Sequence, residues 1–383
     1  MYLSPSSSFF IVFLFISFLF YFLYYHFYLP YSFLSYPKIQ SIKYFRCPSK
    51  KLGPVLHQLS IDNHWTHSNH EWNLYIPCGY NEVEKELRQI TLSSPIHTPL
   101  FIFGIPYCDL FVSKNNLWKI LCHTWGIKNS SQIQPQSWYP KDIFEYKENF
   151  KNGDYFILKK NIQRKQGLYL TNQIQNELHH IHQFVLIQKY IRNTYLIHSY
   201  KCNLRIYFII IMNGKGYKGF YLSKYGKCIY TNKPYNDKDS LDFDTNITSY
   251  HYDVEIYKKN PRTFEELNEY IKKDGKNDKK LWKDIYYLFY QLSYALSKHI
   301  KPISNLPQTK DVFYFQLFGC DVILDEYLKP YLLELNKGPD MIPKDDIDFQ
   351  MKYELQKSIF EKLHLIQKSE KESEKWETIY ETK

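Results

Sequence analysis

The 383-residue sequence predicts a mixed α/β protein, in which antiparallel sheets are flanked by helices and a separate hydrophobic helix comes first. Three observations predict this class. Apolar runs of strand length recur along the chain, some in consecutive pairs joined by short turns. Longer stretches between them carry apolar residues at helical spacing. Because single cores stop growing beyond roughly 250–300 residues, a chain of this length with 44% hydrophobic residues favours two or three lobes.

The first element is a run of 21 mostly aromatic and aliphatic residues, 9–29, without Asp, Glu, Lys or Arg, in which His26 is the only residue that can carry a charge. A helix of this length spans roughly the 30 Å hydrocarbon core of a bilayer. Basic residues follow the run, from Lys38 onward, whereas a secretory signal places them before it. We therefore expect an uncleaved membrane anchor within residues 1–30, with the rest of the chain on the cytosolic side. The alternative is an aromatic-rich extension or an error in the gene model.

After the anchor we expect an irregular join, residues 31–70, and then an N-terminal lobe, residues 71–150. The elements expected in this lobe are a strand, a turn and a helix start over 71–87, a buried strand over 99–106 and a helix over 113–126. Gly126 ends the last of these helical patterns and predicts a stop.

The core of the protein is expected over residues 151–365, followed by a charged tail, residues 366–383. The predicted core elements are a strand, basic loop and strand (154–171), another strand (184–191), an antiparallel meander (202–212 and 216–231), a polar stretch with short helices (236–278), an amphipathic helix (281–300) and a hairpin (312–336). The hairpin turns at Asp325 and Glu326. The mixed charge after it predicts a helix that continues through the tail.

The net charge of +10 favours acidic partners. No basic and aromatic motif of nucleic-acid-binding proteins occurs, so nucleic acid is not an expected partner. The seven cysteines lie far apart and form no CxxC pair. This pattern argues against a disulfide framework and favours reduced thiols in a cytosol-like compartment.

The hairpin carries a candidate metal site. Glu334 and Asn336 are two residues apart in an apolar strand, so both side chains lie on one face. Pairing across the turn could bring Asp321 beside Glu334. Three oxygen ligands suit Mg²⁺, which leaves positions for substrate phosphates. The alternative is an edge hairpin with solvated polar residues, but carboxylates in such apolar sequence would be costly to bury without a cation.

Four cations stand at the ends of predicted strands and could surround a triphosphate. Lys159 precedes a loop that contains a glycine, and Lys189 lies on the next strand. Lys201 and Arg205 flank the tripeptide "CNL" at the start of the third strand. Any one of them alone could be a solvated surface charge. No GxxxxGKS/T loop occurs. A lysine strand and loop, a strand that could read adenine, and an Asp…Glu-x-Asn hairpin follow the order of an ATP-grasp ligase.

Five stretches then point to a family. They are "WNLYIPCGYNEVEKEL", "IFGIPYCDLFVSKNNLW", "YFILKKNIQRKQGLYL", "VLIQKYIRNTYLIHSYKCNLRIYFII" and "FQLFGCDVILDEYLKPYLLELNKGPDM". In these blocks, over roughly residues 70–365, the chain resembles the tubulin–tyrosine ligase-like family, whose fold is of the ATP-grasp type. The last block is the most specific, because it is similar to the family's metal block, "FGxD…LKPWLLExNxxP".

The resemblance implies ATP- and Mg²⁺-dependent ligation of an amino acid, glutamate or glycine first, to a carboxylate of a tubulin tail through an acyl phosphate. The implied metal ligands are Asp321, Glu334 and Asn336. The implied ATP-binding residues are Lys114, Lys159, Gly167, Gln188, Lys189, Tyr190, Ile191 and Asp321. The implied catalytic residues are Lys201, Arg205 and Glu334. The implied partners are the acidic C-terminal tail of tubulin, or another acidic protein, and a free amino acid. The implied location is cytoplasmic or cytoskeletal.

The sequence also departs from the family pattern. The loop "RKQG" keeps only Gly167, although phosphate-cradling loops favour glycine. Asn203 stands where the family has Asp in "KxDLR", and Gln316 stands where it has Glu before "LFG". Ile229 occupies the place of an Arg that often holds the incoming amino acid's carboxylate. The alternative function is therefore a nucleotide-binding pseudo-ligase that binds tubulin or serves as a scaffold.

Overall fold

The computed structural model describes residues 41–47, 50–79, 85–87, 99–151, 153–162, 167–236, 241–248, 253–300, 311–367 and 375–382. The chain divides into two compact units, Met1–Pro37 and Lys38–Lys383, and only the second contains described residues. The predicted anchor, residues 9–29, lies outside the described ranges and remains a prediction. None of the helices within those ranges combines the length and the hydropathy needed to span a bilayer.

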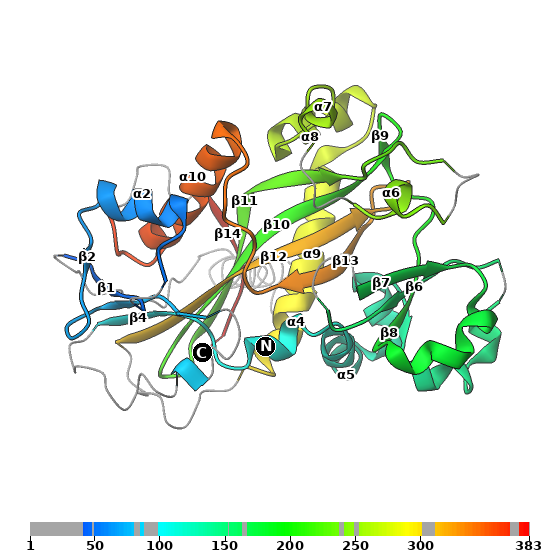
Figure 1. Ribbon diagram of the computed structural model, residues 1–383, viewed down its shortest axis with the longest axis horizontal. Coiled ribbons are helices and arrows are strands. Elements are labelled where there is room, and N and C mark those ends of the chain that lie inside the picture. Colours follow the sequence, from blue (N-terminus) through cyan, green and yellow to red (C-terminus); the bar gives the residue numbers. More distant parts are fainter. Residues whose placement is uncertain are drawn as a thin grey trace, which may run out of the picture. The chain divides into compact units, whose positions relative to one another are not determined.

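A ten-stranded sheet forms the centre of the second unit (Figure 1). Its main path runs β14-β11-β10-β12-β4-β3-β1-β2, with β13 paired to β12 and β9 to β10. The strands are β1 (Lys43–Phe45), β2 (Thr66–His67), β3 (Leu74–Tyr75), β4 (Leu100–Phe103), β9 (Leu196–Ile197), β10 (Tyr200–Asn213), β11 (Lys218–Tyr230), β12 (Val312–Leu324), β13 (Pro330–Asn336) and β14 (Trp376–Thr382). Every residue of β12 is buried, because this strand lies inside the sheet with both of its faces covered.

A smaller antiparallel sheet has the order β5-β8-β6-β7. Its strands are β5 (Ser137–Trp138), β6 (Phe156–Lys159), β7 (Leu168–Thr171) and β8 (Leu186–Lys189). It has its own aromatic core, built around Trp138, Phe150 and Phe156. The expected strand, loop and strand over 154–171, the meander β10–β11 and the hairpin β12–β13 are all present. The predicted mixed α/β class with antiparallel sheets and flanking helices is confirmed.

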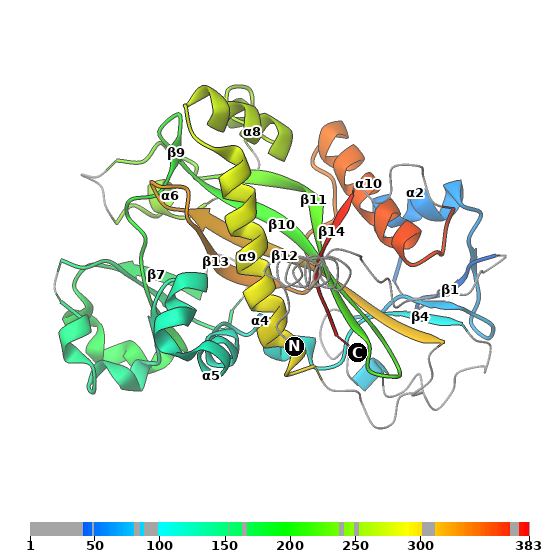
Figure 2. The same cartoon turned by 180° about the vertical axis from the view of Figure 1, so that it is seen from behind.

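Helices flank the large sheet. They are α2 (Pro54–Asp62), α4 (Cys108–Val112), α5 (Lys114–Ile133), α6 (Phe243–Asn246), α7 (Val254–Tyr257), α8 (Phe264–Lys273), α9 (Asp278–Ser297) and α10 (Asp346–Lys362). There are also 3-10 turns, η1 (Pro140–Ile143), η2 (Lys147–Asn149) and η4 (Ile174–Gln183), of which η1 and η4 contribute to the core of the small sheet. The long amphipathic helix is confirmed as α9, which crosses one face of the sheet (Figure 2). It begins where the Asn277 side chain accepts a hydrogen bond from the Lys280 backbone N–H at 3.0 Å.

The expected stop at Gly126 is confirmed, because its φ of 73° and ψ of 163° are not helical and end the first helix of α5. A second helix follows to Ile133, so that α5 consists of two helices joined at this glycine. Two other local expectations are wrong. The expected irregular join, 31–70, contains β1, α2 and β2. The expected helical tail ends instead in β14, which pairs antiparallel with β11. The tail becomes a strand because the edge of β11 offers unpaired backbone groups and Trp376 finds a buried place against α10.

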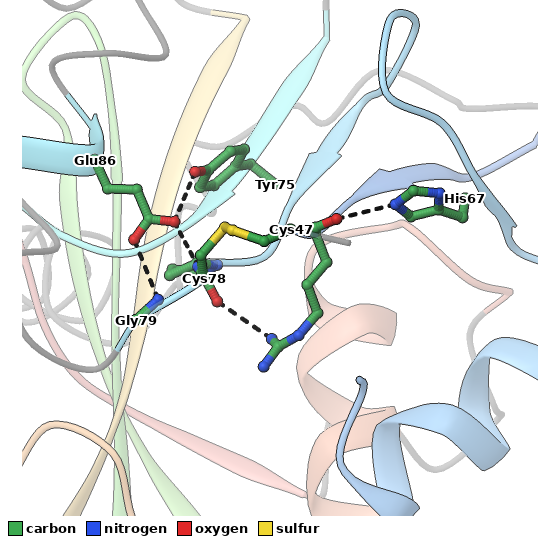
Figure 3. The surroundings of a disulfide bond; sticks show 8 residues. Cys47, His67, Tyr75, Cys78, Gly79 and Glu86 are labelled. Carbon is green, nitrogen blue, oxygen red and sulfur yellow. Dashed lines mark hydrogen bonds between the residues drawn. A yellow bond between two sulfur atoms is a disulfide. The ribbon is translucent and has the colours of Figure 1, made fainter. Parts of the chain in front are cut away.

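The expectation that all seven thiols are reduced is also wrong, because Cys47 and Cys78 form a disulfide (Figure 3). These residues follow β1 and β3, which are neighbouring parallel strands in which Phe45 pairs with Tyr75. Their Cα atoms therefore lie 5.3 Å apart, although 31 residues separate them in sequence. The free cysteines are Cys108, Cys122, Cys202, Cys228 and Cys320.

The disulfide predicts a thiol count. Alkylation of the protein unfolded without reductant should label five cysteines, and seven after reduction. By the chain-entropy model, Cys78→Ser should lower the free energy of unfolding by about 3–4 kcal/mol, measured by urea denaturation. Cys122→Ser, which removes a free thiol, is the matched control and should change the stability little. Seven labelled cysteines before reduction would contradict the assignment.

Candidate active site

A cavity of about 590 Å³ is the place where the predicted site residues meet. Its walls come from β6 and β8 of the small sheet, from β10 to β13 of the large sheet, and from residues 246–248 and 338–344. All of the predicted residues line it except Lys114 and Gly167. This volume is typical of cavities that enclose a whole small-molecule ligand.

The hairpin places two carboxylates face to face. Asp321 of β12 pairs with Glu334 of β13, next to a break in register, so the predicted cross-turn pairing is confirmed. The Asn336 side chain donates a hydrogen bond to Glu334 Oε1 at 2.9 Å, which shows that these two residues share a face. Two carboxylates and one amide therefore converge in the cavity wall, as a hard-oxygen site for Mg²⁺ requires.

The two carboxyl groups differ in their electrostatic surroundings. Burial raises the pKa of Asp321 to about 6, and neighbouring Glu334 adds to this effect while Arg205 opposes it. Burial alone would also raise the pKa of Glu334, but Lys114 and the Asn336 amide hold it below its usual range. Facing carboxylates of this kind favour a bound cation, because a cation relieves both their repulsion and their burial cost.

Arg205 of β10 neutralises Asp321 from the neighbouring strand. The guanidinium binds both carboxylate oxygens, with Nε at 2.6 Å from Oδ1 and Nη2 at 3.1 Å from Oδ2. Burial alone would lower the pKa of Arg205, but Asp321 raises it above its usual range. Gly319 makes room for this side chain, since a Cβ there would lie 3.2 Å from Arg205 Cδ. Three adjacent strands thus hold Arg205, Asp321 and Glu334 in one row.

Lys159 ends β6 as a buried cation. Its Nζ donates to the Leu333 carbonyl at 3.3 Å, one residue from Glu334. Burial lowers the pKa of Lys159 to about 8, with Glu334 acting in the opposite direction. A desolvated ammonium that makes one hydrogen bond to the protein can donate two more, so Lys159 is suited to hold an anion in the cavity.

Lys201 of β10 is enclosed by polar and aromatic groups. Its Nζ donates to the Tyr190 hydroxyl at 2.6 Å and to Asn246 Oδ1 at 3.3 Å. The ammonium also lies 3.9 Å from the centre of the Tyr235 ring. Burial raises the pKa of Tyr190, so its hydroxyl stays neutral. Sequence reasoning missed Asn246 as a functional residue, and its only signal was the weak family match "NITSYH" at 246–251.

Lys114 and Gly167 lie outside the cavity lining. Lys114 Nζ donates to the Ile162 carbonyl at 3.1 Å, and its charge acts on Glu334 from outside the wall. A Cβ at Gly167 would lie 2.8 Å from that same Ile162 oxygen, so glycine is required there by the close approach of the loop backbone. The middle of this loop, residues 163–166, lies outside the described part of the chain.

Lys227 of β11 is a cavity residue that sequence reasoning missed. It pairs with Arg205 across β10 and β11, and its Nζ lies 3.0 Å from Asp348 Oδ1. Asp348 is buried and also binds Lys352, at 2.7 Å. Burial lowers the pKa of Lys227 to about 8, and Lys352 adds to this effect. A single lysine in a strand carries no sequence signal, and Asp348 is 121 residues away. Ile229 lines the same cavity from the same face of β11.

The Arg205–Asp321 pair predicts a large stability effect. Arg205→Met should lower the free energy of unfolding by about 3–5 kcal/mol, because it leaves a buried carboxylate unpaired beside Glu334. Urea denaturation measures this loss, which should shrink in mildly acidic buffer, where Asp321 is protonated. The double variant Arg205→Met with Asp321→Asn is the control and should recover part of the stability. An unchanged midpoint for Arg205→Met would contradict the prediction.

Comparisons with known proteins agree with this geometry. The model of the tubulin-tyrosine ligase family matches residues 105–373. Tubulin polyglutamylase TTLL11 of Mus musculus is 26% identical over 60% of this chain and 34% of its own length. Probable tubulin polyglutamylase TTLL2 of Homo sapiens is 25% identical over 59% and 39%. A probable beta-tubulin polyglutamylase of Tetrahymena thermophila is 25% identical over 57% and 20%.

The chain therefore spans less than half the length of these curated relatives. The matched residues include the cavity, the hairpin with its facing carboxylates and the strands that carry the buried cations. The family match covers well over half of the sequence, and the chain belongs to the tubulin-tyrosine ligase family.

Proposed function

We propose that this protein is an ATP- and Mg²⁺-dependent ligase that joins glutamate to a carboxylate of an acidic tubulin tail. One observation carries the proposal: a single cavity combines a hard-oxygen trio with buried cations, as transfer of a phosphoryl group to a carboxylate requires. The relatives named as tubulin polyglutamylases favour glutamate and tubulin. The net charge of +10 suits an acidic tail, and a tubulin substrate implies action at the cytoskeleton.

Asp321, Glu334 and Asn336 would hold the metal. Their donor set fits Mg²⁺, and burial beside Glu334 raises the pKa of Asp321 even with Arg205 bound to it, so a cation would stabilise the pair further. The ion would supply charge neutralisation on the transferred phosphate. Lys159, beside Glu334, would bind the same phosphates from the small sheet.

Residues 188–191 would line the adenine end of the cavity. Gln188 is buried, and its side chain donates to Ser137 Oγ at 2.9 Å and to the Pro135 carbonyl at 3.3 Å. Because this side chain is already bound to the protein, the adenine ring would contact other groups. These are the backbone of Lys189 to Ile191 and the side chains of Ile157 and Leu168. Gly167 and Lys114 would support this end indirectly, through the loop that carries Ile162.

The reaction would use two steps. An acceptor carboxylate oxygen attacks the γ-phosphorus of ATP, and ADP leaves as the acyl phosphate forms. The amine of glutamate then attacks the acyl carbon, loses a proton and expels inorganic phosphate to leave an amide bond. Lys201 and Arg205 would hold the acceptor and the transferred phosphate, because both are cations fixed in place by neighbouring groups.

A pseudo-ligase is the second candidate, because Asn203 and Ile229 carry no charge where the family places substrate-handling charges. Asn203 lies in the cavity wall, where its amide donates to Thr248 Oγ1 at 2.9 Å. This candidate keeps nucleotide and metal binding but lacks transfer, so the activity of the purified protein separates the two.

The central experiment is transfer of labelled amino acid to tubulin in the presence of ATP and Mg²⁺. We expect labelled glutamate to be incorporated in preference to glycine, and Glu334→Gln to reduce the rate by about 100-fold or more, since it removes a ligand from the transition-state metal. Glu326→Gln changes an exposed carboxylate at the turn of the same hairpin and serves as the matched control. ATP binding without transfer would favour the pseudo-ligase, and preferred glycine transfer would overturn the choice of glutamate.

A second prediction concerns Lys227, which we assign to the carboxylate of the incoming amino acid. Lys227→Met should raise the KM for glutamate about 10-fold or more while leaving the KM for ATP nearly unchanged, since it removes a charge-assisted hydrogen bond. Ile229→Arg on that background should restore much of the loss, because residue 229 faces the same cavity. Lys224→Met, an exposed lysine of the same strand, is the control.

The same assignment predicts a pH effect. The pKa of Lys227 is lowered to about 8, so the side chain is protonated below this value and loses its charge as the pH rises through it. The KM for glutamate should therefore rise above this pH in the unchanged protein. In the Lys227→Met, Ile229→Arg variant the profile should be flatter, because arginine stays charged. A flat profile in the unchanged protein would contradict the assignment.

A further inference from the structure

The two disulfide partners and one glutamate form a cluster of metal-binding side chains. Ligand atoms of Cys47, Cys78 and Glu86 all lie within 4.8 Å of one another. In the described part of the chain, no other group of three or more His, Cys, Asp or Glu side chains is gathered so closely. Each of the three residues is only partly buried, so the cluster lies near the molecular surface. None of them lines the candidate active site, and the cluster is therefore separate from it.

The carboxylate of Glu86 is held beside the two sulfur atoms. It accepts hydrogen bonds from the Tyr75 hydroxyl at 2.8 Å and from the backbone N–H groups of Cys78 and Gly79 (Figure 3). A carboxylate offers about four lone-pair sites, so these contacts leave room for a further partner. Carboxylates that bind metals are themselves hydrogen-bonded in this way, because the contacts fix their orientation. Glu86 is thus positioned as a ligand before a metal arrives.

Cys47 and Cys78 are placed for a shared metal ion as well as for a disulfide. They follow the neighbouring strands β1 and β3, and their Cα atoms lie 5.3 Å apart. Two thiolates on one tetrahedral zinc ion, with Zn–S bonds of about 2.3 Å, lie about 3.8 Å apart. Rotation of the two side chains about their Cα–Cβ bonds can present sulfur atoms at this separation. The backbone that forms the disulfide can therefore also hold a metal.

Arg46 balances the charge of such a site. Burial lowers the pKa of Arg46 and the charge of Glu86 opposes this, so the guanidinium lies within the electrostatic reach of the cluster. Its Nη1 donates to the carbonyl of Pro77, the residue before Cys78, at 3.2 Å. Two thiolates and one carboxylate carry three negative charges, of which a divalent ion neutralises two and Arg46 offsets the third. Partly buried charges are tolerated when they are neutralised in this way.

The donor set selects the metal. Mg²⁺ and Ca²⁺ bind oxygen ligands, whereas thiolates favour Zn²⁺ and Cu(I). A carboxylate beside two thiolates favours Zn²⁺, because Cu(I) is selected by sulfur ligands. His67 is engaged elsewhere, since its Nε2 lies 3.0 Å from the Arg46 carbonyl oxygen. The fourth position of a tetrahedral ion would therefore belong to water, which the partial exposure of the cluster admits.

We propose that Cys47, Cys78 and Glu86 form a zinc site when the disulfide is reduced. A dithiol reductant gives two electrons and two protons to the S–S bond, which breaks into two thiols while the reductant closes its own disulfide. Zn²⁺ then binds both sulfur atoms and displaces the two protons. Where the compartment keeps thiols reduced, the metal takes over the link between β1 and β3 that the disulfide makes. This proposal does not depend on the proposed ligase activity.

The test is a zinc titration of the full chain in competition with a chromophoric chelator. The chain is reduced with a phosphine, which does not compete for zinc as a dithiol would, and is compared with the unreduced chain. We expect one tight site after reduction and at least about 100-fold weaker binding before it, because a disulfide offers no thiolate. The five free cysteines are present in both forms, so the comparison isolates Cys47 and Cys78. Co²⁺ in place of Zn²⁺ should give thiolate-to-cobalt charge-transfer absorption in the reduced chain.

Variants of the reduced chain identify the ligands. Cys78→Ser should weaken zinc binding at least about 100-fold and Glu86→Gln about 10-fold or more, since the loss even of a group that only orients a ligand costs about 10- to 100-fold. Glu71→Gln is the matched carboxylate control, because Glu71 is exposed and pairs with Lys43 at 2.8 Å. Cys122→Ser removes a free thiol and is the matched cysteine control. Both controls should leave the zinc affinity unchanged.

Three outcomes would overturn the proposal: equal zinc binding by the reduced and unreduced chains, unchanged affinity in a folded Cys78→Ser protein, or unchanged affinity in Glu86→Gln, since two thiolates alone would be a different site. Circular dichroism of the variants checks their fold. If Cys78→Ser does not fold, the comparison of the reduced and unreduced forms of the unaltered chain still decides the matter, because only the reduced form offers the two thiolates.

Discussion

The row of Arg205, Asp321 and Glu334 across three adjacent strands is the constraint on which the site depends. Their register sets two carboxylates against each other inside the fold, where like charges repel strongly. The bidentate contact of Arg205 balances one of them. Lys159 and Lys114 act on the other from the small sheet and from the start of α5. Charges on the small sheet and on α5 therefore stabilise a buried carboxylate of the large sheet.

The other two largely buried cations of the cavity, Lys201 and Lys227, are bound by polar side chains next to them. Lys201 rests on Tyr190 and Asn246, and Lys227 rests on Asp348, which Lys352 also binds. Because of these contacts, both ammonium groups stay at the cavity wall and do not pair with the carboxylates of the hairpin. Groups positioned before a ligand arrives do not have to reorganise during a reaction, and this is the main way in which proteins stabilise phosphoryl transfer.

In the function that we propose, the chain keeps the metal and phosphate side of the cavity and changes the side that takes the amino acid. Ile229 removes a charge from β11, and Lys227 supplies one two residues away on the same face. Because both positions face one cavity, such an exchange moves an anion by only about two residues of strand length, or roughly 6–7 Å. The departures from the family pattern would then mark a shifted amino-acid subsite in a working enzyme.

The hairpin, the meander, α9 and the strand that ends at Lys159 could all be predicted from the amino-acid sequence, because residue period and turn residues are local properties. The same local information was enough to put Asp321, Glu334 and Asn336 together, since only a short turn separates their strands. It also favoured a helical tail, and in that region the free edge of β11 outweighed the charge pattern.

Contacts between distant parts of the chain were decided by the tertiary structure alone. The parallel strands β1 and β3 bring Cys47 to Cys78 across 31 residues. Asp348 meets Lys227 across 121 residues. Asn246 and Lys201, which are 45 residues apart, are likewise brought into contact only by the fold. Local periodicity carries no information about such pairs, because they form only where separate elements pack, and the packing of the whole unit sets which side chains then face each other.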